Sequence, residues 1–231
     1  MFAIESENVV GYQKIAIPTG YSLFTVTFQD VVGGEYDLKD ITPLDANGNT
    51  LTSSMAKIKI QKMDSSGAYL TIYNYNTLGG RGWCQGMTAL TDGQVTFKDG
   101  ESFCINNGQG AEVMFQVQGA VNLAPQSTVL STGFSLTGNM TPVTVDLKDI
   151  VPCDANGNAL TSSMAKIKVQ KMDETGAYLT IYNYNTLGGR GWCQGMTALT
   201  AGQVTLEPGE SICVNNGQGE PIILKFPSPL E

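Results

Sequence analysis

A block of 22 residues occurs twice in this chain without a substitution. Residues 69–90 read YLTIYNYNTLGGRGWCQGMTAL, and the same letters stand at residues 178–199. A shift of 109 residues aligns residues 37–110 with residues 146–219, and about 12 of those 74 positions differ. Copies this similar must fold alike, and the period exceeds the roughly 20 to 50 residues of a solenoid unit. The sequence therefore predicts two tandem homologous domains, residues 1–121 and 122–231.

Alternating patterns inside the repeat are typical of β-strands. Ile58 and Ile60 alternate with lysines, and after a turn at residues 64–67 tyrosines alternate with aliphatic and polar residues. This period of two places one face of each strand against a core. The segment therefore predicts an antiparallel hairpin.

Further strands are expected on both sides of Asp99-Gly100, at residues 94–98 and 102–106, because Asp-Gly is a strong hairpin turn signal. Residues 112–119 predict another strand, and residues 37–42 and 86–91 predict one helical turn each. We expect two all-β domains, each of about seven or eight antiparallel strands in a sandwich or partly open barrel.

Composition and charge restrict the partners. The chain has 231 residues and a net charge of −8, with its 13 basic residues scattered. Nucleic-acid binding requires a continuous basic surface, so we expect no nucleic-acid partner. No apolar run is long enough for a transmembrane helix, so we expect no membrane span.

The residue types that catalyse reactions are sparse. The chain contains no histidine, which excludes Ser-His-Asp and Cys-His sites and removes the commonest zinc ligand. Residues 78–83 are glycine-rich but lack the spacing of a phosphate-binding loop. Four acidic residues in turn-like stretches are candidates for paired carboxylates, although solvated side chains are expected there: Glu35, Asp37, Asp40 and Glu101. We therefore predict a non-enzymatic protein with no cofactor.

A short acidic and amide motif occurs once in each repeat. It places oxygen side chains at alternate positions, as the opening of a calcium loop does: Asp45, Asn47 and Asn49, with Asp154, Asn156 and Asn158 in the second copy. The twelfth position of a calcium loop carries a glutamate, whereas here it is Ala56. Because Asn-Gly also forms tight turns, a turn is the favoured interpretation and a calcium site the alternative.

Four of the five cysteines keep the same spacing in both repeats. We expect one disulfide within each domain, Cys84–Cys104 and Cys193–Cys213, with buried free thiols as the alternative. Cys153 replaces Leu44 of the first copy, so we expect a buried thiol there, with an intermolecular cross-link as the alternative.

Aromatic side chains in the repeated block suggest a ligand-binding face. The set comprises Tyr69, Tyr73, Tyr75 and Trp83 in the first copy and Tyr178, Tyr182, Tyr184 and Trp192 in the second. Aromatic rings can stack on sugars, and two such faces in one chain would add avidity. Aromatic residues that alternate along a strand also commonly complete a core, which is the alternative.

Three short motifs carry a resemblance to a known group of proteins. They are Asn8–Tyr12 (NVVGY), Ile17–Leu23 (IPTGYSL) and the Gly100–Phe103 (GESF) hairpin, for which Glu207–Glu210 (EPGE) in the second copy is the better match. The chain resembles exported, β-rich bacterial proteins of unknown function that share this opening, a Gly-Trp segment and a final PGE hairpin. The resemblance implies a secreted or cell-surface location, although Met1 does not begin a leader peptide. It implies no catalytic residue.

Two functional hypotheses follow. The first is an extracellular structural or assembly protein, such as a surface-layer or filament subunit, that self-associates through its N-terminal extended segment. The second is an extracellular carbohydrate- or surface-binding module of the adhesin type, whose glycan or cell-surface ligand lies on the aromatic face.

Overall fold

The fold is known from a computed structural model of the chain. The structure describes residues 10–27, 35–52, 55–64, 66–97, 100–120, 125–161, 164–173 and 175–228. Much of the expected domain boundary, residues 121–124, therefore lies outside the described residues, as do Asn8 and Val9 of the N-terminal motif.

The chain is all-β, and its sheets are antiparallel. In the first half the strands are β1 (Val10–Ile17), β2 (Gly20–Thr25), β3 (Tyr36–Asp37), β4 (Thr42–Leu44), β5 (Met55–Met63), β6 (Tyr69–Asn76), β7 (Gly82–Gln85), β8 (Thr88–Ala89), β9 (Thr96–Phe97), β10 (Ser102–Asn107) and β11 (Val113–Ala120). In the second half they are β12 (Ser127–Leu130), β13 (Gly133–Gly138), β14 (Val145–Asp146), β15 (Val151–Cys153), β16 (Met164–Met172), β17 (Tyr178–Asn185), β18 (Gly191–Gln194), β19 (Thr197–Ala198), β20 (Thr205–Leu206), β21 (Ser211–Asn216) and β22 (Ile222–Lys225).

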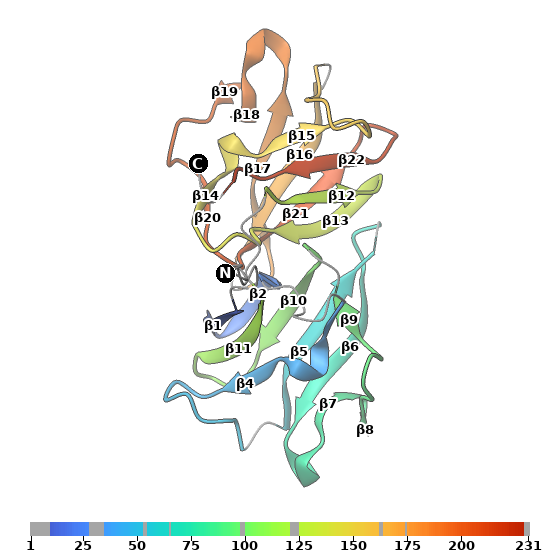
Figure 1. Ribbon diagram of the computed structural model, residues 1–231, viewed down its shortest axis with the longest axis vertical. Helices are drawn as coiled ribbons and strands as arrows, with labels where there is room; N and C mark the ends of the chain where they lie inside the picture. The colour runs from blue at the N-terminus through green and yellow to red at the C-terminus, as the bar shows by residue number, and fades with distance from the viewer. Residues whose placement is uncertain are drawn as a thin grey trace, which may run out of the picture.

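The sheets have the same strand order in both halves. The first half contains a three-stranded sheet, β1-β11-β4, and a six-stranded sheet, β2-β10-β5-β6-β7-β8. The second half repeats these as β12-β22-β15 and β13-β21-β16-β17-β18-β19. The strand pairs β3-β9 and β14-β20 complete the two sets. Figure 1 shows the two halves stacked along the long axis of the molecule.

The β5–β6 hairpin forms as predicted. Ile60 pairs with Tyr73 across the two strands. The turn between the strands is held by Asp64, whose carboxylate accepts hydrogen bonds from the backbone N–H groups of Ser66 and Ala68. Gly67 has φ 88°, a conformation that glycine adopts without steric cost. The duplicated turn at Gly176 has the same conformation.

The hairpin predicted around Asp99-Gly100 is wrong. Strand β9 pairs with β3, while both edges of β10 are occupied by β2 and β5. The turn signal is local, whereas the partners of β10 come from segments more than 40 residues away in the sequence. Residues 98 and 99 lie outside the described residues.

Short helical turns occur at only one of the two predicted places in each repeat. Residues Leu38–Asp40 and Leu147–Asp149 form 3-10 helices, and two more lie at Leu78–Gly80 and Leu187–Gly189. The prediction for residues 86–91 is wrong, because this segment forms a turn followed by strand β8. Among the described residues, each half contains eleven short strands, more than the seven or eight expected.

Each half has a hydrophobic core of its own, and a third cluster joins the halves. The first core draws on both sheets of the first half, with Phe103 of β10 and Phe115 of β11 fully buried. The second core is built in the same way from residues of the second half. The joining cluster contains Leu23, Cys104, Leu136 and Cys213, with partly buried tyrosines and methionines packed against them.

Candidate functional site

The repeated aromatic residues mostly face the cores. Trp83 on β7 is 2% exposed, and its indole Nε1–H donates a hydrogen bond to the carbonyl oxygen of Ile41 at 2.8 Å. Tyr75 packs edge-on against this indole, with ring centroids 5.3 Å apart, and Tyr73 also packs on the core. Trp192 makes the matching hydrogen bond to Ile150 at 2.7 Å. Tyr182 and Tyr184 pack on the second core.

The first tyrosine of each block has a different environment. Tyr69 and Tyr178 lie at the junction of the halves, where their hydroxyl groups share a hydrogen bond at 2.5 Å. Burial raises the pKa of both hydroxyls above the ordinary value. Three pairs of the predicted ligand face thus pack on the cores, and the fourth joins the halves. Together these rings do not form an exposed stacking surface.

The predicted disulfides are not formed, and all five cysteines are buried free thiols. Cys84 lies on β7 and Cys104 on β10, with β5 and β6 between them in the sheet. Three inter-strand spacings separate such Cα atoms by about 14 Å, whereas a disulfide requires less than about 7 Å. The same order separates Cys193 on β18 from Cys213 on β21. Equal sequence spacing reflected the duplication and not covalent pairing.

The thiols differ in what surrounds them. Cys104 and Cys213 belong to the cluster that joins the halves, and burial raises the pKa of each to about 11. Cys153 on β15 is 1% exposed, as Leu44 at the matching position is 3% exposed. Burial also raises the pKa of Cys153. The position therefore accepts a small apolar side chain, and its thiol is not presented for cross-linking.

The Asp-Ala-Asn-Gly-Asn loops form closed turns. Asp45 Oδ1 accepts hydrogen bonds from the backbone N–H groups of Asn47 and Asn49, both at 2.9 Å. The Asn49 side-chain amide donates to Asp45 Oδ2 at 3.3 Å. These hydrogen bonds lower the pKa of the Asp45 carboxyl, and the bond from the Asn49 backbone has the largest effect. Asp154 has the same contacts with Asn156 and Asn158. Both carboxylates therefore accept hydrogen bonds from their own loops.

Three of the four acidic candidates separate into two groups, and the fourth, Asp40, is exposed at the end of the first 3-10 helix. Asp37 caps a 3-10 helix by accepting a hydrogen bond from the backbone of Lys39, and it also accepts one from Gly93. Glu101 forms an ion pair with Lys62 at 2.8 Å. Glu35 accepts a hydrogen bond from Thr96, and the Lys62 ammonium donates to the Thr96 carbonyl at 2.6 Å. These contacts connect four residues into one polar wall: Glu35, Lys62, Thr96 and Glu101.

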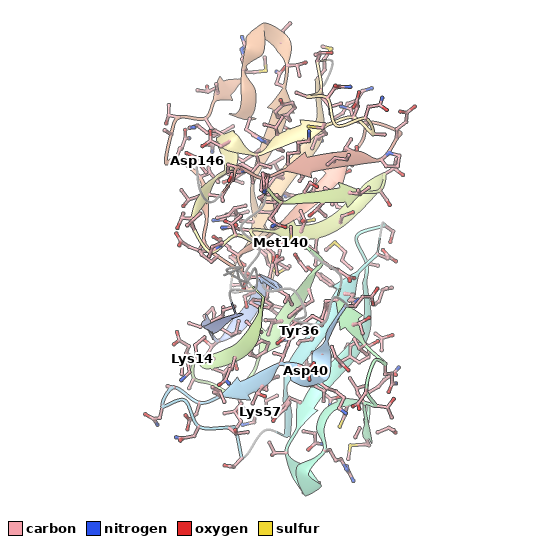
Figure 2. The ribbon with its side chains drawn as sticks, viewed as in Figure 1. Lys14, Tyr36, Asp40, Lys57, Met140 and Asp146 are labelled. Carbon is pink, nitrogen blue, oxygen red and sulfur yellow. The ribbon has the colours of Figure 1, made fainter. Side chains whose placement is uncertain are left out.

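That wall faces a cleft of about 660 Å³ between the two halves. The opposite wall comes from β12, β13 and the turn between them. It carries hydroxyl groups and one aromatic ring: Ser127, Thr128, Ser131, Phe134 and Ser135. The Thr128 hydroxyl is buried and finds no hydrogen-bond partner among the described residues. Met140 lies where the two halves meet (Figure 2).

Apolar side chains are exposed at equivalent positions of both repeats, on β6 and in the β7–β8 turn. We call this surface the flank patch: Leu70, Ile72 and Met87, which are 51%, 46% and 65% exposed. The turn is held against β6 because the Asn74 amide donates a hydrogen bond to the Gly86 carbonyl at 3.3 Å. The second flank patch comprises Leu179, Ile181 and Met196, at 54%, 45% and 67%.

Sequence reasoning missed both surfaces. The flank patch falls inside the repeated block, but the tyrosines and tryptophan drew the functional hypothesis. The aliphatic residues of β6 could have indicated this surface. Leu70 and Ile72 share their face of the sheet with polar neighbours such as Gln61 on β5, as expected for a face that is turned away from the core. The cleft had no signal in the sequence, because its walls come from segments far apart in the chain.

No family model, curated protein or solved structure matches this chain. Within the described residues, no three cysteine, aspartate or glutamate side chains are grouped to hold a metal ion. No helix in the described part of the chain has the length and apolar character to cross a membrane.

Proposed function

We propose that this protein is a non-enzymatic structural subunit that self-assembles outside the cell. It consists of two homologous β-sandwich domains, residues 1–121 and 122–231. Two observations support the domain proposal: the strand order is the same in both halves, and each half has a separate hydrophobic core. The flank patches carry the proposal of self-assembly.

Burial of the flank patches provides the driving force. Each patch exposes three large apolar side chains by about half, and burying such a side chain contributes about 1 kcal/mol. A contact between two patches therefore gains roughly 6 kcal/mol from these six side chains, against which the entropy of association must be set. This balance predicts weak contacts that become significant when many copies are joined.

The duplication gives each copy two equivalent patches. When one patch binds the same patch on a second copy, the other patch of each molecule stays free. Repetition of this contact produces an open-ended assembly and not a closed dimer. A chain with one repeat would stop at the dimer, so the duplication itself supports a filament or layer.

The N-terminal extended segment is already paired along one edge. Strand β1 pairs over its full length with β11 of the same half, from Val10 opposite Ala120 to Ile17 opposite Val113. Strand β1 lies at the end of its three-stranded sheet, so a neighbouring strand could add only at its other edge. The flank patches offer two equivalent apolar contacts in each copy, so we assign self-association to them.

The extracellular location rests on the resemblance of the N-terminal and PGE motifs to exported proteins. Buried free thiols are compatible with an oxidising environment, because a thiol reacts as the exposed thiolate. The absence of histidine from the sequence supports a role other than catalysis.

The test is light scattering after gel filtration, together with electron microscopy, over a range of protein concentrations. We expect the unmodified protein to form particles that grow with concentration. Ile72→Lys should stop growth at dimers, because one patch remains, and so should Ile181→Lys. The double variant should be monomeric. Leu78→Lys is the matched control, because Leu78 is also exposed, at 56%, but lies outside the flank patch.

A monomer at all concentrations, or a double variant that assembles like the unmodified protein, contradicts the proposal. The decisive result is a defined dimer from each single variant, because a general loss of solubility or folding would not produce one.

A second function is favoured by the cleft between the halves. Its polar wall, its hydroxyl groups and the ring of Phe134 match a neutral oligosaccharide, which offers hydroxyls to bond and an apolar face to stack. The specific observation is the Thr128 hydroxyl, for which the described part of the chain offers no hydrogen-bond partner, because a buried group of this kind gains stability from a partner. A glycan array should then give a signal that Phe134→Ala abolishes, while Tyr21→Ala, the equivalent position outside the cleft, leaves it unchanged.

A further inference from the structure

The contact between the two halves has the pattern of a symmetric dimer. Tyr69 and Tyr178 occupy the same place in their repeats, and their hydroxyl groups bond to one another. Gly67 lies against the ring of Phe134, and its counterpart Gly176 lies against the ring of Tyr21. Tyr21 and Phe134 are themselves equivalent in the aligned GYSL and GFSL segments. Each contact therefore occurs twice, related by an approximate twofold axis.

One side chain lies between equivalent residues of both halves. The Thr25 hydroxyl, which is fully buried, shares hydrogen bonds at 2.5 Å with the hydroxyls of Ser102 and Ser211. These two serines are 109 residues apart and hold the same position in the two repeats. A hydroxyl group that bridges equivalent partners occupies the axis, and a second copy of it cannot occupy the same space.

The residue equivalent to Thr25 is Gly138. A Cβ atom at position 138 would lie 2.2 Å from Thr25 Oγ1 and 2.3 Å from the carbonyl oxygen of Glu210. The backbone of Gly138 is not in the left-handed region, in contrast to the turn glycines of the chain. The lack of a side chain is therefore required by space and not by the backbone conformation.

We propose that Thr25 and Gly138 form a pairing code that restricts the first half to association with a second half. Two first halves would bring two threonines to one site on the axis. Two second halves would bring two glycines and leave buried serine hydroxyls without the bridging group, which disfavours the complex. The partner that this surface fits is the opposite half, from the same chain or from a second copy.

The inference does not depend on the flank patches or on self-assembly. It concerns the interface inside the molecule, where the repeats have diverged although the block around Tyr69 has not. If copies exchange halves, the code permits only alternating first-to-second contacts.

The direct test uses the full chain with a protease site inserted between Leu123 and Ala124. The purified protein is cut, unfolded in urea and refolded. Native mass spectrometry then identifies each complex by its mass, because the two halves have different masses. We expect complexes of one first and one second half, with like-with-like pairs at less than about a tenth of their amount. Like-with-like pairs in the statistical ratio overturn the proposal.

Uncut variants give a second, independent measurement. Gly to Ala at an unstrained extended position normally raises the melting temperature by restricting the unfolded chain. Here we expect Gly138→Ala to lower it by at least about 5 °C. We expect Thr25→Val, which keeps the shape and removes the hydroxyl, to lower it by less. Ser22→Ala is the control, because that hydroxyl has no partner among the described residues. A rise for Gly138→Ala, or equal effects of Thr25→Val and Ser22→Ala, contradicts the code.

Discussion

Replacing the buried indole of each half tests whether the duplicated block has the same structural role twice. The substitutions are Trp83→Phe and Trp192→Phe. Both side chains are almost fully buried, and both donate a hydrogen bond to a backbone carbonyl 42 residues away. Phenylalanine keeps an aromatic ring on the core but removes the N–H group and part of the volume.

The expected cost follows from these two losses. An unsatisfied buried carbonyl at Ile41 or Ile150 costs about 1–3 kcal/mol. The volume difference of roughly 38 Å³ adds about 1 kcal/mol if the cavity stays open. We therefore expect each substitution to lower the free energy of unfolding by about 3 kcal/mol. The two values should agree within about 1 kcal/mol, because the surroundings differ chiefly by Phe115, which packs near Trp83.

The assay is urea unfolding followed by tryptophan fluorescence. The chain has two tryptophans, so each variant retains one that reports on the half left unchanged, and circular dichroism follows the whole chain. Tyr73→Phe is the control, since Tyr73 is only partly buried and should change stability by less than about 0.5 kcal/mol. A change below about 1 kcal/mol in either variant, or a large effect in only one, would refute the equivalence of the two sites.

Three further predictions follow from the site. A thiol reagent should react with none of the five buried cysteines in the native protein and with all five in urea, and a reductant should leave the melting temperature unchanged. Raised pKa values of Tyr69 and Tyr178 mean that their contribution to stability is fully present below pH 10, the ordinary value, and is lost as the pH rises through the folded-state values. Melting curves between pH 8 and about pH 11 should therefore fall less steeply for the Tyr69→Phe/Tyr178→Phe variant than for the unmodified protein; equal slopes would contradict the shared burial. Calcium should not alter the melting temperature, because Asp45 and Asp154 accept hydrogen bonds from their own loops, and a rise of several degrees would show that calcium displaces those bonds.

The structure explains why some sequence predictions succeeded and others failed. The β5–β6 hairpin was predicted correctly because alternation and a tight turn are local properties. The partners of β10 were not, since an Asp-Gly turn indicates a reversal but does not decide which strands pair. The disulfides failed for the same reason: two strands stand between Cys84 and Cys104 in the sheet, a separation that spacing along the chain does not reveal.

The sequence by itself determined that the chain is all-β and internally duplicated, because strand periodicity and internal repetition follow directly from the order of the residues. Only the tertiary structure decided what the repeated block does. In the folded chain Trp83 is buried in the core, Tyr69 contacts Tyr178, and Ile72 is exposed. These outcomes depend on how sheets pack and on where an approximate twofold axis passes. Thr25 and Gly138 differ because a single position on that axis holds only one side chain.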